Sequence, residues 1–308
     1  MKKRIGILGL GGVGGYFGGL LAKAYFDSGT IEIVFIARGE TKKAITANGL
    51  KIVLDDNEMI VFPNLVSDDP EKIGNLDYLI CATKTYDIEA SLDSIKKCIS
   101  SKTTILPLYN GTDAMHRILN LFPENIVLQG CVYIVSKIES PGVIRKIGHF
   151  EKLFFGSKDI SEDTVKELQT ILEKANIESS LVTNIEETVW EKFIFISALA
   201  SATSYLNANI AGILNNPDNK ALYVSLVNEV IAIALAKGLK LPNDIVYQTI
   251  IKLEKSPQDN TSSMHRDFLA GHKTEVKSLT EFVVKEGLKY AIPTPMYKKI
   301  LDQLLGII

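Results

Sequence analysis

Short apolar runs alternate with amphipathic stretches through the first half of the chain. The strand-length runs are Arg4–Leu8, Ile31–Ile36, Asp77–Ala82 and Thr103–Leu108, and the helical stretches between them are Val13–Asp27, Glu40–Ala47 and Asp87–Ile99. Strands that alternate with helices in this way are typical of βαβ units. The pattern therefore predicts a parallel sheet covered by helices, which is the Rossmann type of α/β domain.

Four further runs fall outside that series. Lys51–Leu54 and Met59–Phe62 are predicted to pair as antiparallel strands. Val127–Val135 and Val143–Ile147 are predicted as two more strands, and Ser140-Pro141-Gly142 supplies the turn residues between them.

From about Asn184 onward the pattern is helical only. Punctuation by Asn215-Asn216-Pro217, Gly238 and Ser256-Pro257 separates the helices. The longest expected helix begins near Ile185. The others span Asp218–Ala236, Asp244–Glu254, Ser263–Lys289 and Pro295–Leu305. We expect two domains, a Rossmann domain over residues 1–183 and an all-α domain over residues 184–308.

Bulk composition narrows the class of protein. Of the 308 residues, 46% are hydrophobic and 23% are charged, with a formal net charge of −2, which gives no basic excess for nucleic acid. The basic start MKKR followed by an apolar run is a pattern that signal peptides also show. Eight glycines within Gly6–Gly19 argue against a signal peptide here. Phe193–Ala202 is too short to span a bilayer. Three isolated cysteines suit a reducing compartment and form no metal motif, so we expect a cytoplasmic protein without membrane or metal.

A glycine-rich loop joins the first predicted strand to the first predicted helix. Gly9, Gly11 and Gly14 form a G-x-G-x-x-G pattern, with Gly12 and Val13 between them. Such glycines permit the tight turn, the approach of a pyrophosphate and close helix packing, while the helix N-terminus favours phosphate. The motif in this context predicts dinucleotide binding; the alternative is a glycine-rich turn that binds nothing.

Residues at the ends of later strands indicate which dinucleotide binds. Arg38 stands where an NAD enzyme would carry an acidic residue, and a guanidinium can pair with a 2′-phosphate, so NADP(H) is predicted. A solvated surface arginine is the alternative. Lys84 and Asn110 follow two strands at the edge where α/β sheets bind ligands, although each also suits an ordinary turn.

Taken in order, these landmarks resemble the ketopantoate reductase (2-dehydropantoate 2-reductase) family. The matching residues are Gly9–Gly15, Arg38, Thr83-Lys84, Asn110-Gly111, Trp190-Glu191-Lys192, Ser262-Ser263-Met264 and Glu275. The resemblance implies a Rossmann domain, a helical domain like that of 6-phosphogluconate dehydrogenase, and an active site between them. It also implies reduction of a 2-keto acid by NADPH in pantothenate synthesis.

The resemblance further assigns roles to individual residues. Lys192 matches the lysine that protonates the carbonyl oxygen, and its apolar helix would lower the pKa of its ammonium. Glu275 matches a glutamate that accepts from a substrate hydroxyl or orients the lysine. Ser263 matches a substrate-binding serine, and backbone N–H groups would join it if it caps the following helix. Lys84 and Asn110 match residues near the nicotinamide, and Asn110 also contacts substrate. The residues alone allow a plainer interpretation, in which Lys192 and Glu275 are solvated surface charges.

The chain departs from the family at two positions. Many members carry asparagines four and eight residues after the catalytic lysine, where this chain has Ile196 and Ala200. Ser197 and Ser201 are one place further along and should face elsewhere on a helix. A different 2-keto acid without a 4-hydroxyl is therefore an alternative substrate, and a non-catalytic NADP-binding sensor is another alternative.

The apolar face of Ala221–Ala236 would suit either a homodimer interface or the core. His265 and His272, taken to share one helix, are too far apart to share a metal.

Overall fold

The computed structural model describes residues 2–157 and 162–306. Contacts between residues divide the chain into two compact units. The first comprises Met1–Tyr109 and Asp113–Ile185, and the second comprises Asn110–Thr112 and Glu186–Ile308. Each unit encloses hydrophobic clusters of its own, so each is described by itself.

The first unit contains the predicted parallel sheet. Its strand order is β5-β2-β1-β6-β7, and every neighbouring pair is parallel. The strands are β1 (Lys3–Leu8), β2 (Ile31–Ile36), β5 (Leu65–Ser67), β6 (Leu76–Cys81) and β7 (Ile99–Pro107). The connecting helices are α1 (Gly12–Tyr25), α2 (Gly39–Asn48), α3 (Pro70–Ile73), α4 (Ile88–Ser94) and α5 (Ala114–Leu121). This arrangement confirms the Rossmann domain.

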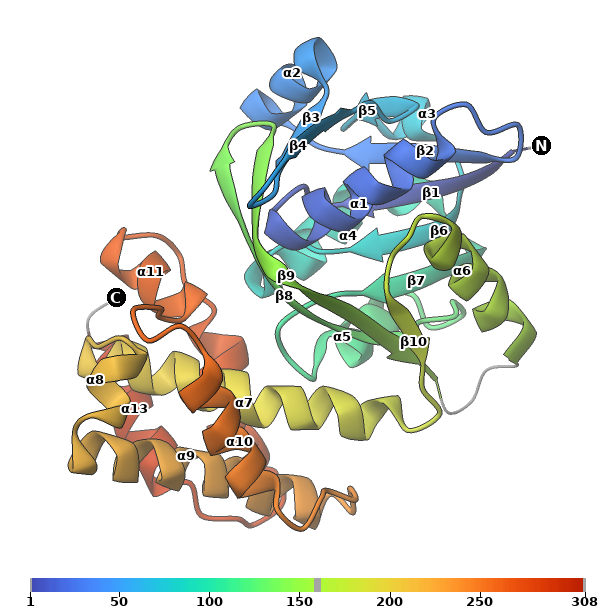
Figure 1. The fold of residues 1–308 in the computed structure, drawn as a ribbon. Coiled ribbons are helices and arrows are strands. Elements are labelled where there is room, and N and C mark those ends of the chain that lie inside the picture. Colours follow the sequence, from blue (N-terminus) through green and yellow to red (C-terminus); the bar gives the residue numbers. More distant parts are fainter. Residues whose placement is uncertain (1, 158–161, 307–308) are drawn as a thin grey trace. The chain divides into compact units, whose positions relative to one another are not determined.

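A second sheet in the same unit has the order β10-β9-β3-β4, with β8 paired to β9. Its members are β3 (Leu50–Val53), β4 (Glu58–Val61), β8 (Gln129–Ser140), β9 (Val143–Gly156) and β10 (Ser179–Leu181), and α6 (Glu162–Lys174) precedes β10. The pair β3–β4 is antiparallel, as predicted. β8 and β9 form the long green hairpin of Figure 1 and extend well beyond the strands expected from sequence.

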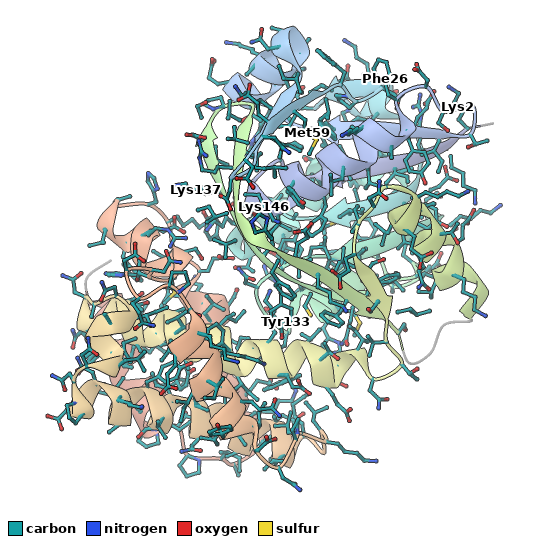
Figure 2. All side chains as sticks on the ribbon, in the orientation of Figure 1. Lys2, Phe26, Met59, Tyr133, Lys137 and Lys146 are labelled. Carbon is teal, nitrogen blue, oxygen red and sulfur yellow. The ribbon has the colours of Figure 1, made fainter. Side chains whose placement is uncertain are left out.

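Helix α1 packs between the two sheets. An added Cβ on Gly14 or Gly18 would meet the first sheet and its loops, whereas one on Gly12, Gly15 or Gly19 would meet β8, β9 or β3. A polar link accompanies this packing. Lys146, labelled on the hairpin in Figure 2, pairs with Glu151, which accepts a hydrogen bond from the Tyr16 hydroxyl of α1 at 2.9 Å. The glycines therefore let a helix lie close to backbone on both sides.

Every regular element among the described residues of the second unit is a helix, as predicted. Its helices are α7 (Ile185–Leu206), α8 (Ile210–Leu214), α9 (Pro217–Ala236), α10 (Ile245–Lys255), α11 (Ser263–Leu269), the π-helical turn η3 (Lys277–Glu281), α12 (Phe282–Lys289) and α13 (Pro295–Leu305). Figure 1 shows them in yellow to red. Helix α9 is long and apolar enough for a membrane span by length and composition, a test that buried core helices also pass. Its Tyr223, Leu226 and Val230 are buried in the core.

Two predicted helices are wrong in extent. The helix expected over Ser263–Lys289 is interrupted, because α11 ends in a turn at Gly271, whose φ of 66° is left-handed. His272 therefore lies outside α11, and His265 and His272 do not share a helix. The helix expected over Asp87–Ile99 is limited to α4, flanked by the 3-10 turns η1 (Thr85–Asp87) and η2 (Lys96–Cys98). Cys98, the last residue of η2, is fully buried.

Candidate active site

The loop between β1 and α1 has the geometry that its glycines predict. Gly9 has a φ of 95°, and a Cβ there would lie 2.6 Å from the backbone nitrogen of Thr83. A Cβ on Gly14 would lie 2.0 Å from the carbonyl oxygen of Gly9. Gly11 differs, because a Cβ there would meet no atom within 4 Å. Gly9 and Gly14 thus serve the fold, whereas Gly11 leaves backbone open to a ligand.

A cavity of about 270 Å³ opens beside this loop, wholly within the first unit. Gly9, Gly11, Ala37 and Arg38 line it. The first N–H groups of α1, including those of Gly12 and Val13, have no partner within the helix. Backbone donors, an apolar wall and a guanidinium fit an anionic nucleotide, so the residues present suit NADP(H).

One residue that lines this cavity belongs to an ion pair that the motif did not reveal. Arg38 is exposed and precedes α2. Asp68, another lining residue, accepts from the Lys42 ammonium at 2.6 Å. That hydrogen bond holds the pKa of the Asp68 carboxyl below its usual value, with a smaller contribution from Arg38. No local sequence signal marks the Lys42–Asp68 pair. Asp68 reaches Lys42 and Arg38 because β5 pairs with β2.

Lys84 lies at the start of η1, in the loop that follows β6, and is half-buried. Among the described residues, its neighbours Thr83 and Asp87 line the cavity but Lys84 does not. Arg117 of α5 holds this loop by donating to the Thr85 carbonyl oxygen at 2.8 Å. The same guanidinium forms a two-point ion pair with Glu89, so the loop has a fixed backbone.

In the second unit, Lys192 is buried and its ammonium donates to the side-chain oxygen of Asn110 at 2.9 Å. Only 7% of Lys192 is exposed, which contradicts the interpretation of it as a solvated surface charge. Next to it on α7, the rings of Trp190 and Phe193 pack edge to face at 5.6 Å. Trp190 is 3% exposed and is thus a core anchor that fixes the helix turn carrying Lys192. A buried ammonium on an amide oxygen is a proton donor held in place.

Glu275 and Ser263 lie in the same unit. Glu275 is 4% exposed and lies two residues before η3, so it is also no surface acid. Ser263 is the first residue of α11 and half-buried. Ser263 does not cap the helix; the residue before it does, because the Ser262 hydroxyl accepts from the His265 N–H at 3.0 Å. This leaves the Ser263 side chain outside the capping interaction.

The polar residues that follow Lys192 on α7 face the core. Ser197 shares a hydrogen bond with the Tyr297 hydroxyl at 2.9 Å, and Ser201 shares one with Thr280 at the same distance. Both serines are fully buried. They cannot replace the missing asparagines, and Ile196 and Ala200 remain the residues on the side that Lys192 shares.

The fold and these features define a class, the Rossmann-type oxidoreductases with a helical second domain. Residues 5–159 match the family model "Ketopantoate reductase PanE/ApbA", and residues 184–307 match the model of its C-terminal part. The chain belongs to the ketopantoate reductase family. It is an oxidoreductase that uses NADPH to reduce a keto acid, and this confirms the resemblance and the cofactor inferred from sequence.

Individual relatives agree with the family. A solved 2-dehydropantoate 2-reductase from Porphyromonas gingivalis is 33% identical, with a TM-score of 0.86 over 99% of this chain and 100% of that one. A 2-dehydropantoate 2-reductase from Streptococcus pyogenes is 24% identical over 96% of this chain and 95% of its own. D-mandelate dehydrogenase, solved with NADH and anilino(oxo)acetate, has a TM-score of 0.88 at 21% identity over 99% and 98% of the two chains, which is a likeness of fold.

Proposed function

We propose that this protein reduces 2-dehydropantoate (ketopantoate) to pantoate with NADPH, as a cytoplasmic step of pantothenate biosynthesis. The observation that carries the proposal is the buried Lys192 ammonium on the Asn110 oxygen. The name of the Streptococcus pyogenes relative supports the choice of substrate.

The cofactor would be held by the first unit and by Asn110. NADPH, when bound, supplies a hydride to the carbonyl carbon of the keto acid. The glycine-loop backbone would take the pyrophosphate and the Arg38 guanidinium the 2′-phosphate. Lys84 and Asn110 would contact the nicotinamide end. The loop residues are Gly9, Gly11, Gly12, Val13 and Gly14.

Lys192 would complete the reduction as the general acid. As the ketone carbon gains a hydride, negative charge develops on its oxygen, and a fixed ammonium there both stabilises the charge and gives up a proton. The side-chain oxygen of Asn110 can only accept, so it orients one N–H of the Lys192 ammonium. Ser263 would donate to the substrate carboxylate, and Glu275 would accept from a substrate hydroxyl or orient Lys192.

Replacing Lys192 tests this role. We expect Lys192→Met to lower kcat by about 100-fold or more, the scale of general-acid catalysis. Lys192→Arg should also be impaired, because a guanidinium keeps its protons at neutral pH. Lys237→Met is the matched control, since Lys237 is another largely buried lysine of this unit, 5.6 Å from the Trp190 ring centre. Near-normal turnover by Lys192→Met would remove Lys192 from the mechanism.

A second candidate substrate follows from Ile196 and Ala200. Neither side chain can bond a 4-hydroxyl, so a branched 2-keto acid without that group is the alternative. The matched probe is 3,3-dimethyl-2-oxobutanoate, which is ketopantoate with hydrogen in place of the hydroxyl. Oxidation of NADPH is measured with both. The proposal requires a higher kcat/KM for ketopantoate, and a clear preference for the probe would select the second candidate.

A further inference from the structure

The ion pair between Lys42 and Asp68 lies where the cofactor's adenosine end is proposed to bind. Asp68 comes one residue after β5, and Arg38 comes two residues after β2. These strands pair in parallel with Ile36 beside Ser67, so the two charged residues emerge next to each other. Both line the same cavity.

A carboxylate at this point opposes the binding of a 2′-phosphate, which carries about −1.5 to −2 charges at neutral pH. Lys42, in the first turn of α2, offsets it through a contact of 2.6 Å. With Arg38, Lys42 and Asp68 together, the local charge is two positive and one negative. Without Lys42, the charges of Arg38 and Asp68 cancel, and Asp68 is left to compete with the phosphate for the Arg38 guanidinium.

We propose that Lys42 determines the preference for NADPH over NADH by pairing with Asp68, which keeps Arg38 available for the 2′-phosphate. Lys42 is thus a positioning residue that acts through Asp68, and the inference rests on the proposed placement of the 2′-phosphate at Arg38. NADH has no 2′-phosphate, so loss of the Lys42–Asp68 ion pair should change the affinity of the protein for NADH little.

The neighbouring Lys43 offers a matched control. It lies on the same helix and pairs with Glu40 at 2.8 Å, with 76% of its side chain exposed. Lys43→Met removes the same charge from the same helix but leaves Asp68 neutralised. A general loss of positive potential would affect both variants alike, whereas the proposed mechanism affects only Lys42→Met.

The test measures binding to the full chain rather than turnover. Calorimetry would give Kd values for NADPH and NADH, and for the fragments 2′,5′-ADP and 5′-AMP, which differ by the 2′-phosphate. For Lys42→Met we expect Kd to rise about tenfold for NADPH and 2′,5′-ADP, the scale of a charge-assisted contact near the surface. Kd for NADH and 5′-AMP should change by less than about twofold, as should all values for Lys43→Met.

A second substitution tests the route through Asp68. Adding Asp68→Asn to Lys42→Met should restore NADPH affinity to within about threefold of wild type, because no carboxylate then needs a partner. A double variant as weak as Lys42→Met would overturn the inference, and so would an equal loss of NADPH and NADH. Arg38→Ala separates the two levels. If it binds NADPH normally, the proposed phosphate site is wrong; if it loses NADPH while Lys42→Met behaves like Lys43→Met, only the present inference fails.

Discussion

At the scale of single residues, His265 shows how burial shifts a protonation equilibrium. Its Nε2 lies 2.9 Å from the Asn207 side-chain oxygen, which can only accept, so Nε2 carries hydrogen. Its Nδ1 lies 2.6 Å from the Thr261 hydroxyl, which can donate or accept. Burial, and then the charge of Arg266, lower the pKa of His265 below its ordinary 6.5.

This lowered pKa makes stability depend on pH. Below about pH 6.5 the unfolded chain protonates this histidine more readily than the folded chain does. The contribution of neutral His265 to the free energy of unfolding is therefore complete above that pH and is lost as the pH falls below it. We expect the free energy of unfolding, measured with urea at pH 7.5 and 5.5, to fall less in His265→Gln than in wild type. Equal falls in the two proteins would show that His265 does not titrate as described.

The glycines of the β1–α1 loop predict separate effects on folding and binding. Gly14→Ala should destabilise the protein by several kcal/mol, about the cost of overpacking against backbone, since its Cβ would lie 2.0 Å from a carbonyl oxygen. Gly11→Ala should leave the unfolding temperature unchanged but weaken NADPH binding, because its Cβ enters open space in the cavity. Calorimetric melting and NADPH titration distinguish them, and equal destabilisation by both would contradict this division.

At the scale of elements, α1 has more glycine than a dinucleotide loop requires. Gly15 and Gly19 face the second sheet, where added Cβ atoms would lie 2.6 Å from Ile144 and 2.3 Å from Ile52. The motif explains the start of the helix, whereas the later glycines reflect the two sheets between which the helix packs. That second contact involves strands up to residue 156 and has no local signature.

Helix α7 offers a test of substrate choice. Ile196 is half-buried, so an asparagine there can be accommodated, whereas Ala200 is 2% exposed and has no such room. We expect Ile196→Asn to raise the ratio of kcat/KM for ketopantoate over 3,3-dimethyl-2-oxobutanoate by up to about tenfold, the value of one hydrogen bond. Ile196→Leu is the control, and an unchanged ratio in Ile196→Asn would mean that this position does not meet the 4-hydroxyl.

At the scale of the whole molecule, the chain has two units with hydrophobic cores of their own. The cavity beside the glycine loop lies in the first unit, and the Lys192–Asn110 pair is grouped with the second. Unfolding therefore need not be a single two-state event, and ligands should stabilise the unit that holds them.

NADPH binding should be visible as local protection. At 100 times its Kd, a ligand stabilises the binding state by about 2.7 kcal/mol, so amide hydrogens of α1 and β2 should exchange more slowly with NADPH present. Hydrogen exchange followed by mass spectrometry measures this, and Arg38→Ala should require more NADPH for equal protection. Unaltered exchange in α1 at saturating NADPH would contradict the proposed cofactor site.

The local pattern of the chain was enough to predict the parallel sheet, the glycine loop, the helical second half and NADP(H), because strand and helix periods and turn chemistry are local. It was not enough to predict the break at Gly271 or the shift of the α11 cap to Ser262. Tertiary structure alone decided which polar groups meet. The pairing of β5 with β2 brings Asp68 to Lys42. Asn110 accepts a hydrogen bond from Lys192, which lies 82 residues further along the chain. Such contacts depend on how distant elements pack, and no spacing along the chain records them.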